Sequence, residues 1–369
     1  MDTKAVQCYR TFFPESQGGL EQVVLEIARG GGGEVLTLSD RGASSGEYSG
    51  VRYRTARRWF SVASCCVGPG LFLEVLKNSS GVLHFHFPWP FGDLVYAVAG
   101  RSRPLVITYH SDIVRQRWLG SLYRPLMHWF LRRADRIVAT SANYVESSDV
   151  LRAYRDKVEV IPLGIAEGLY PSLERSCVES VKAKYGTDFM LFVGVLRYYK
   201  GLEFLIRAAA GRPYPIVIAG KGPEEERLRE LASQLGAKNV HFTGFVDDDE
   251  KMALMQLCRA VVLPSHLRSE AFGVTLIEGL MSSKPLVSCE LGTGTSYVNV
   301  HGQTGFVVQP ASPKSLRQAL DRLWESPDLA ERMGRAGRLR YEALFTGERM
   351  VRAYIDLYCR VLRERGLGV

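Results

Sequence analysis

Short apolar runs alternate with longer amphipathic stretches along this 369-residue chain, and this alternation most constrains its fold. Apolar runs bounded by turn residues predict buried strands, whereas apolar residues at i, i+3, i+4 and i+7 predict helices. Strands that alternate with helices predict right-handed βαβ units and parallel sheets. The alternation occurs twice, with a break near residues 164–180. The sequence therefore predicts an α/β protein of two doubly wound, Rossmann-like domains that face each other across a cleft.

The predicted elements follow the chain in order. In the first half, the predicted strands are Val35–Leu38, Val82–Phe87, Leu105–Tyr109, Arg136–Thr140 and Val158–Pro162. In the second half, they are Met190–Val193, Ile216–Ala219, Val240–Phe242, Ala260–Pro264, Leu286–Cys289 and Gly305–Val308. Helical spacing predicts helices at Leu20–Ala28, Trp118–Arg133, Leu202–Ala210, Glu224–Leu235, Asp249–Cys258, Phe272–Met281 and Lys314–Glu325. An apolar stripe from Met350 to Leu362 predicts a long terminal helix that packs on another element.

Composition narrows the class of protein. The chain is 46% hydrophobic and 23% charged, the balance of a folded globular protein. Its formal charge of +8 favours anionic partners such as nucleotides, acidic membranes or nucleic acid. An arginine-rich surface without such a partner is the alternative. The seven cysteines include no C-x-x-C pair, so we expect reduced thiols and a cytoplasmic protein. We also expect no signal peptide and, without an uncharged run of ~20 apolar residues, only peripheral membrane contact.

The most specific stretch, residues 269–288, contains two carboxylates, Glu270 and Glu278, with seven residues between them. Glu270 follows a predicted strand, and Glu278 lies inside the helix that comes next. Free backbone amides at the helix start, at Phe272, Gly273 and Val274, create a site for an anion. Carboxylates on either side of an anion suit a ligand with a diphosphate centre and hydroxylated ends. The alternative is that Glu270 caps the helix and Glu278 lies on a solvated face.

This stretch resembles the signature of the family 4 retaining glycosyltransferases, which have the GT-B fold. Three further stretches resemble that family in the same order: Pro14–Glu21 its glycine loop, Phe192–Leu202 its phosphate clamp, and His301–Val308 its late glycine turn. The resemblance implies an acceptor-binding domain at 1–168, to which the terminal helix at about 350–369 returns. It also implies a nucleotide-sugar-binding domain at 169–349.

The resemblance also implies roles for individual residues. The catalytic set is Glu270 and His110, which orient the sugar, and Lys200 and Arg197, which neutralise the diphosphate. The family's usual arginine is replaced by Val195, and we expect Arg197 to take its place. The donor-binding set is Gly18, Gly19, Gly194, Gly220, Phe245, Phe272, Gly273, Val274 and Glu278, the last on the ribose. His84 and His86 line the acceptor side. No metal or cofactor is expected.

Several of these residues also allow other interpretations. His110 follows a predicted strand, where a neutral imidazole suits either a sugar hydroxyl or a phosphate oxygen. Together with His84 and His86 it could mimic a three-histidine metal set, which no nearby carboxylate or cysteine supports. Asp247–Asp249 contains a D-x-D triplet, which we interpret as a helix cap and not as a metal site. Gly220–Gly222 predicts a close turn beside the donor.

Two segments mix arginines with aromatic residues, at 115–136 and 52–60. Such mixtures bind anionic membranes or nucleic acids, and they also occur on helices whose aromatics face the core. Because related enzymes bind a lipid-linked acceptor through the first domain, we favour docking at the inner face of the cytoplasmic membrane. No common nucleic-acid motif is present, so nucleic acid is not an expected partner.

Three segments are similar to bacterial mannosyl- and rhamnosyltransferases that build O-polysaccharides of lipopolysaccharide on a lipid carrier: 86–90, 109–116 and 292–299. The resemblance implies transfer of mannose or rhamnose from a nucleotide-diphosphate sugar, with GDP favoured, to a lipid-linked saccharide. A UDP-sugar transferase, a nucleotide-sugar epimerase and, less favoured, a nucleic-acid-binding protein are the alternatives.

Overall fold

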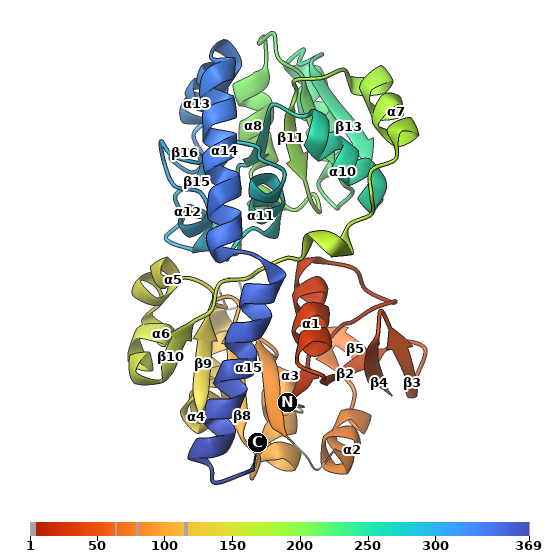
Figure 1. The fold of residues 1–369 in the computed structure, drawn as a ribbon, viewed down its shortest axis with the longest axis vertical. Helices are drawn as coiled ribbons and strands as arrows, with labels where there is room; N and C mark the ends of the chain where they lie inside the picture. Colours follow the sequence, from red (N-terminus) through yellow and green to blue (C-terminus); the bar gives the residue numbers. More distant parts are fainter. Residues whose placement is uncertain (1–4, 63–64, 79–80, 114–116, 369) are drawn as a thin grey trace. The chain divides into compact units, whose positions relative to one another are not determined.

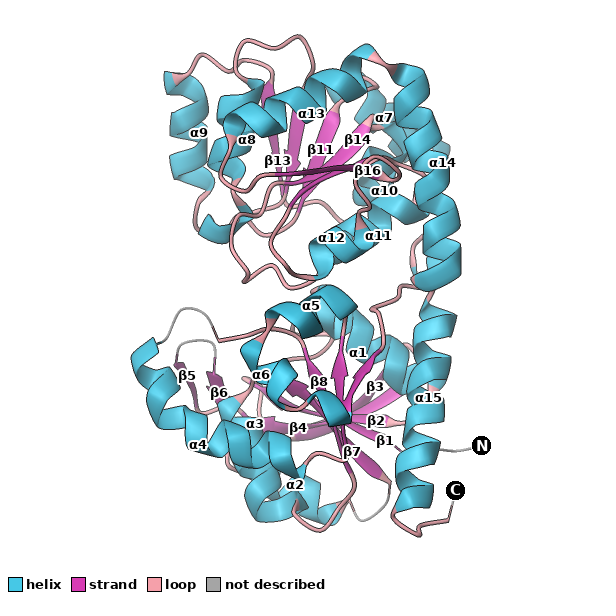
Figure 2. Ribbon diagram, turned by 90° about the vertical axis from the view of Figure 1, so that its left-hand side faces the viewer, coloured by secondary structure: helices cyan, strands magenta, loops and turns pink. Residues whose placement is uncertain are grey.

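The computed structural model describes residues 5–62, 65–78, 81–113 and 117–368, with side chains omitted for 117–122. Two compact units make up the chain (Figure 1). Unit 1 contains Met1–Ile165 and Gly347–Val369, and unit 2 contains Ala166–Thr346. Each unit is an α/β domain in which helices surround a sheet (Figure 2). All seven cysteines are free, as expected for reduced thiols.

Unit 1 is built on an eight-stranded sheet in the order β10-β9-β8-β7-β1-β2-β4-β3. Its strands are β1 (Ala5–Cys8), β2 (Glu34–Ser39), β3 (Ser44–Tyr48), β4 (Val51–Arg57), β7 (Val82–Phe87), β8 (Leu105–Tyr109), β9 (Arg136–Ala139) and β10 (Val158–Val160). All neighbouring pairs are parallel except β3 with β4. A separate antiparallel hairpin joins β5 (Phe60–Val62) to β6 (Cys65–Val67).

All helices of unit 1 except the terminal helix α15 lie between its strands along the chain. The helices of this unit are α1 (Gly19–Gly30), α2 (Gly70–Lys77), α3 (Pro90–Val95), the π-helical turn η1 (Tyr96–Gly100), α4 (Arg117–Arg133), α5 (Ala142–Ser147), α6 (Asp149–Ala153), the short turn η2 (Arg155–Lys157) and α15 (Gly347–Glu364). The terminal helix α15 packs on α1 and on β7, so the end of the chain returns to the unit that contains its beginning. At the α1–α15 contact, a side chain at Gly30 would collide with Val351.

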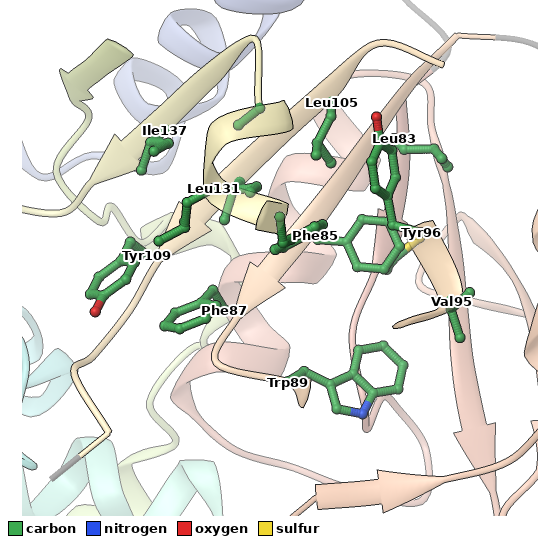
Figure 3. Close-up of a cluster of buried hydrophobic side chains, with 14 of the residues drawn as sticks. Leu83, Phe85, Phe87, Trp89, Val95, Tyr96, Leu105, Tyr109, Leu131 and Ile137 are labelled. Atoms are coloured by element: carbon green, nitrogen blue, oxygen red, sulfur yellow. The ribbon is translucent and has the colours of Figure 1, made fainter. Parts of the chain in front are cut away.

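Strand β7 shows that one face of the unit 1 sheet is apolar and the other carries polar side chains. Successive side chains of a strand point to opposite faces. Leu83, Phe85 and Phe87 belong to an apolar cluster that includes Trp89 and Tyr96 (Figure 3). The intervening residues His84 and His86 lie on the other face, where α15 covers the sheet. Burying the apolar face removes large aromatic surfaces from water, which is the main contribution to the stability of such a core.

Unit 2 contains a six-stranded, wholly parallel sheet in the order β13-β12-β11-β14-β15-β16. Its strands are β11 (Met190–Val193), β12 (Ile216–Ala219), β13 (Val240–Gly244), β14 (Ala260–Leu263), β15 (Leu286–Cys289) and β16 (Gly305–Val308). Its helices are α7 (Arg175–Tyr185), α8 (Leu202–Ala209), α9 (Glu225–Gln234), α10 (Asp248–Leu257), α11 (Val274–Met281), α12 (Gly294–Val298), α13 (Pro313–Glu325) and α14 (Pro327–Leu344), with the short turns η3 (Glu167–Leu169) and η4 (Tyr198–Lys200).

The structure corrects several sequence predictions. Strands β1 and β3–β6 were not predicted, and neither were helices α2, α3, α5, α6, α7, α12 and α14, of which α7 begins inside the expected break. Helix α14 contains Gly334 and Gly337, which interrupt its apolar stripe because they pack against Ser283 and Leu280 of unit 2. Helix α11 begins at Val274 and not at Phe272, since Gly273 adopts a left-handed conformation at φ 83°.

A close backbone approach beside β16 gives a stability test. A Cβ at Gly305 would lie 1.9 Å from the carbonyl oxygen of Leu286, and its φ of 156° is unfavourable for other residues. We expect Gly305→Ala to lower the free energy of unfolding by at least about 3 kcal/mol, measured by urea denaturation. Gly302→Ala is the matched control, because its φ is 76° but no atom lies within 4 Å, and we expect a cost of about 1 kcal/mol. Equal losses for the two variants would contradict this account.

Candidate donor-binding and catalytic site

The site residues of unit 2 gather at the carboxyl edge of its sheet. Strand order reverses between β11 and β14, and open α/β sheets bind ligands at the carboxyl end of such a reversal. Lys200 follows β11, and Glu270 follows the neighbouring β14. The two residues are 70 positions apart in sequence, yet they come from the two strands that flank the reversal. The fold therefore brings together two of the four residues that the sequence predicted as catalytic.

Lys200 and Glu270 form a largely buried ion pair, with side chains 13% and 10% exposed. The Lys200 Nζ lies 2.5 Å from Glu270 Oε2, and the Ser265 hydroxyl donates to the same oxygen at 2.9 Å. Burial alone would lower the pKa of Lys200, but attraction to Glu270 outweighs it and raises that pKa above its usual value. The lysine therefore stays charged at neutral pH. A buried cation next to a carboxylate suits a ligand that carries both phosphate and hydroxyl groups.

Glu278 is held by two partners that the sequence did not single out. It lies on α11, is 6% exposed, and accepts from the Tyr170 hydroxyl at 2.8 Å and from Lys251 Nζ at 3.0 Å. Lys251 also pairs with Asp248 at 2.7 Å. Burial opposes the charge on Lys251, but these two carboxylates raise its pKa overall. No spacing in the sequence links Tyr170, in the connecting segment, to a helix more than a hundred residues later.

Glycines allow three loops to meet at this edge. A Cβ at Gly220 would lie 2.0 Å from the carbonyl oxygen of Gly194, and both residues have positive φ, 135° and 149°. The Gly220 amide donates to the Gly244 carbonyl at 2.8 Å. These contacts confirm the predicted close turn and leave the next residue, Phe245, 69% exposed. An exposed aromatic side chain beside a carboxyl-edge loop is available to stack on a flat ring.

The start of α11 contributes backbone and not the side chain of Phe272. Phe272 is 4% exposed and packs against Phe345 at 6.2 Å between ring centroids, so its ring belongs to the core. Gly273 is the N-cap and Val274 the first helical residue. The Thr275 hydroxyl donates to the Val193 carbonyl at 3.3 Å, which ties this helix start to β11. The arrangement directs the positive end of the helix dipole to the carboxyl edge.

Arg197, the expected partner of Lys200, lies on the exposed loop between β11 and η4. Its main-chain carbonyl accepts the amide of Lys200 at 3.0 Å. Val195, which stands where the family has arginine, is 51% exposed. The contribution of Arg197 to anion binding stays a prediction.

Unit 1 holds the glycine loop through a carboxylate. Gly18 is the N-cap of α1 and Gly19 its first residue. The Glu21 carboxylate accepts from the Thr11 hydroxyl at 2.9 Å and from the Ser16 hydroxyl at 2.7 Å. A Cβ at Gly18 would lie 2.7 Å from the other oxygen of Glu21. The loop is thus pinned to the first turn of α1, and a side chain at Gly18 would have to displace the Glu21 carboxylate.

His110 lies directly after β8 and is 6% exposed. Its amide donates to the Phe87 carbonyl at 3.0 Å, and its Nε2 lies 2.9 Å from His86 Nδ1. Burial, with a smaller contribution from Arg10, lowers the pKa of His110 to about 3. The imidazole is therefore neutral at physiological pH, as the sequence analysis assumed for a group that hydrogen-bonds a ligand.

His84 and His86, which were expected to line the acceptor side, are buried inside unit 1. They are 0% and 1% exposed, and all four ring nitrogens are hydrogen-bonded within unit 1. Their assignment to the acceptor side stays a prediction, but neither ring is open to a ligand in this structure. The three-histidine metal set is not present: His86 and His110 bond each other, and the described residues contain no group of three or more metal-ligating side chains. Asp247 caps α10 by accepting from Glu250 N at 2.8 Å, as predicted.

The two arginine–aromatic segments differ in exposure. Arg115 lies outside the described residues, and the side chains of Arg117 and Trp118 are not described. On α4, Phe130 is fully buried, and Trp129 lies beneath the guanidinium groups of Arg101 and Arg133 at 5.8 and 5.9 Å. In the other segment, Trp59 and Phe60 are 67% and 53% exposed. Within the described chain, no helix combines the length and apolarity needed to cross a bilayer.

The buried histidines predict a steep loss of stability in acid. Burial lowers the pKa of His84 and of His110 to about 3, and burial with its histidine neighbours lowers that of His86 well below normal. Between pH 3 and the unfolded pKa of ~6.5, the unfolded chain binds more protons than the folded protein, so stability falls as pH falls. We expect a loss of about 2 kcal/mol per buried histidine between pH 7 and pH 5.

Urea denaturation at both pH values measures this effect. His84→Gln removes one of the three buried groups, so its loss between pH 7 and pH 5 is smaller by about 2 kcal/mol. His241→Gln is the matched control because His241 is exposed, and it keeps the wild-type pH dependence. A wild-type protein equally stable at pH 7 and pH 5 would show that these histidines are not buried in the neutral form.

Comparison with known proteins agrees with this geometry. Residues 17–167 match the family described as Glycosyltransferase Family 4, and residues 178–340 match Glycosyl transferases group 1. The D-rhamnosyltransferase WbpZ of Pseudomonas aeruginosa is 48% identical over 351 residues, 93% of this chain and 92% of WbpZ. The O-antigen chain mannosyltransferase C of Escherichia coli is 40% identical over 371 residues, 98% of this chain and 100% of that protein.

Solved structures show the same fold at low sequence identity. Sucrose-phosphate synthase of Thermosynechococcus elongatus has a TM-score of 0.79 at 20% identity, covering 98% of this chain and 100% of its own. HepE of Anabaena, in complex with UDP and glucose, has a TM-score of 0.78 at 19% identity, covering 96% and 99%. Both are GT-B neighbours, which confirms the predicted fold class. The chain belongs to the family 4 glycosyltransferases.

Proposed function

We propose that this enzyme transfers D-rhamnose or mannose from a GDP-sugar to a lipid-linked saccharide in O-antigen synthesis, with retention of anomeric configuration. The observation that carries the proposal is identity of 48% and 40%, over nearly the full chain, to a D-rhamnosyltransferase and an O-antigen mannosyltransferase. The carboxyl-edge site supports it, because a buried lysine, two carboxylates and a helix start lie together there.

In this proposal the donor lies along the carboxyl edge of unit 2. Glu278 holds the ribose, and Phe245 lies beside the base. Lys200 and Arg197 hold the diphosphate, together with backbone amides of Gly18, Gly19, Gly273 and Val274, while Gly194 and Gly220 allow close approach. Glu270, already oriented by Lys200 and Ser265, and His110 orient the sugar.

The chemistry then follows from where charge develops. As the glycosidic bond to the diphosphate breaks, negative charge grows on the leaving phosphate oxygens. Lys200, Arg197 and the dipole of α11 stabilise that charge from fixed positions, with little reorganisation. The acceptor hydroxyl attacks from the face that the nucleotide leaves, and a departing phosphate oxygen takes its proton. Each step uses groups of this chain or of the donor.

Nucleotide selectivity is the first test of the donor. A ligand that binds only the folded protein raises its melting temperature by mass action. We expect GDP to raise the melting temperature more than UDP, ADP or TDP, and the shift to persist in EDTA. Selective stabilisation by UDP would keep the family and overturn the GDP donor. If GDP stabilises the protein selectively, GDP-D-rhamnose or GDP-mannose is then added with a lipid-linked saccharide, and transfer of the hexose is measured.

The anion-binding role of Lys200 is tested by substitution. Lys200→Ala removes the buried cation beside Glu270, and we expect kcat/KM for hexose transfer to fall by at least about a hundredfold. Lys238→Ala removes an exposed lysine of the same unit and serves as the matched control. Activity of Lys200→Ala within a few-fold of the control would remove Lys200 from the site.

We also propose that unit 1 docks on the inner face of the cytoplasmic membrane, where a lipid-linked acceptor resides. Exposed apolar side chains lie on the β5 strand and the segment before it, on α2, and on α3 with η1: Trp59, Phe60, Val62, Leu73, Leu76, Leu94 and Val98. These elements contact one another through α2 with η1 and α3 with β6. Exposed arginines lie on the adjacent α4: Arg124, Arg132 and Arg133. Apolar side chains beside cations favour an anionic bilayer surface.

Vesicle binding tests this docking. We expect the protein to co-sediment with phosphatidylglycerol vesicles and much less with phosphatidylcholine vesicles, and high salt to weaken binding. Replacing Trp59 and Phe60 by Ser should reduce the partition coefficient at least about tenfold. Leu339→Ser is the control, because Leu339 is equally exposed at 67% but lies in unit 2. Equal loss in the control, or no binding by the wild type, would contradict docking through unit 1.

A further inference from the structure

We propose that Gln7 and His86 are positioning residues that hold His110 in a single neutral tautomer, with the Nδ1 lone pair directed to a hydroxyl of the transferred sugar. The sequence alone does not single out Gln7, and it is compatible with His110 binding either a hydroxyl or a phosphate oxygen. The role toward sugar rests on the proposed function, whereas the tautomer rests on unit 1 alone.

Strand register places the participating side chains on one face of the sheet. Gln7 of β1 pairs with His84 of β7, and His86 pairs with Thr108 of β8. His110 follows Thr108 by two residues. Because side chains alternate along a strand, all five point to the face that α15 covers. Gln7, His84 and Thr108 are 0% exposed and His86 is 1% exposed, so bulk solvent does not reach most of this layer.

The orientation of the Gln7 amide sets the direction of the hydrogen bonds. Its Nε2 donates to the Tyr358 hydroxyl at 3.1 Å. Its Oε1, which has no hydrogen to give, lies 3.0 Å from His86 Nε2. His86 must therefore carry its proton on Nε2.

The protonation site of His86 then determines the protonation site of His110. A neutral imidazole has one N–H, so the Nδ1 of His86 is an acceptor. That atom lies 2.9 Å from His110 Nε2, which must donate to it. His110 is neutral because burial lowers its pKa, so its single proton is on Nε2 and its Nδ1 carries a lone pair. Within the described chain, no side chain or backbone group bonds this Nδ1.

The hydrogen bonds of Tyr358, His84 and Thr108 agree with this direction. The Tyr358 hydroxyl accepts from Gln7, so its own proton is free to bond His84 Nδ1 at 2.7 Å. His84 then donates from Nε2 to the Thr108 hydroxyl at 2.7 Å. Thr108 bonds the Tyr354 hydroxyl at 2.8 Å. Turning the Gln7 amide over would reverse the bonds from Tyr358 to His110 and place a hydrogen on His110 Nδ1.

The tautomer decides what His110 binds. An Nδ1 lone pair accepts a hydrogen bond from a sugar hydroxyl and repels a phosphate oxygen, which has no hydrogen at neutral pH to donate. An Nδ1–H would favour the phosphate instead. The hydrogen-bond chain from α15 therefore makes His110 a sugar-hydroxyl acceptor and leaves the diphosphate to the cations of unit 2.

Nitrogen-15 NMR of histidine-labelled wild-type protein reads the tautomer directly. We expect His110, assigned by the signals lost in His110→Gln, to show a protonated Nε2 and an unprotonated Nδ1. A protonated Nδ1 on His110 would overturn the proposal. This experiment needs no activity, so a correct tautomer in a protein that transfers no hexose would refute the proposed function and leave the tautomer assignment standing.

Substitutions test the positioning role. Gln7→Met keeps the side-chain volume but removes both amide bonds, and we expect mixed His110 tautomers and a kcat/KM about tenfold lower. Tyr354→Phe is the matched control, because it removes a hydroxyl at the far end of the layer, and it should leave both the spectrum and kcat/KM unchanged. Wild-type kinetics in Gln7→Met, or the same loss in Tyr354→Phe, would overturn the positioning role. Tyr358→Phe, which frees the amide without altering β1, replaces Gln7→Met if that variant does not fold.

Single-deoxy donor sugars complete the test. Removing the hydroxyl that bonds His110 should lower kcat/KM about tenfold in wild type and about twofold or less in His110→Gln. If each single-deoxy donor lowers kcat/KM by as much in His110→Gln as in wild type, then His110 does not bind a sugar hydroxyl.

Discussion

The packing of α15 on the central strands of unit 1 is the contact on which much of this structure depends. It encloses a layer of polar side chains that an open sheet face would leave in water. Buried polar groups are costly unless each is hydrogen-bonded, and here Tyr354 and Tyr358 of the helix provide the bonds that the strands lack. The last helix of the chain thus completes the surroundings of His110, which lies directly after β8.

Much of the fold could be predicted because its strands are short, apolar and buried on both faces. Strands such as β7, β8 and β11 were predicted at their observed bounds. β1 and the β3–β4 hairpin were missed because β1 contains the polar Gln7 and the hairpin is rich in Ser, Arg and Tyr. Their place in the sheet comes from pairing with distant strands, which a local pattern does not contain.

Some residues of the candidate site could likewise be predicted from the sequence, and others could not. Glu270, Glu278 and Lys200 were found because they lie in stretches that resemble a family signature. Lys251, Tyr170 and Gln7 were not, since their roles depend on neighbours brought together by the fold: Glu278 for the first two and His86 for the third. Phe272 illustrates the reverse case, where a residue inside the signature places its ring in the core and offers only backbone.

The proposed function requires Lys200 to bind both the Glu270 carboxylate and a phosphate of the donor. Lys200 and Ser265 both bond Glu270 Oε2, and no group of the described residues bonds Oε1, which the proposed function assigns to a sugar hydroxyl. An ammonium group has three N–H donors, so Lys200 is able to keep this bond while it binds a phosphate oxygen. Donor binding then requires no rupture of a buried ion pair, whose loss would leave an uncompensated charge. In the proposed function, the pair fixes the distance between the group assigned to the sugar and the group assigned to its leaving phosphate.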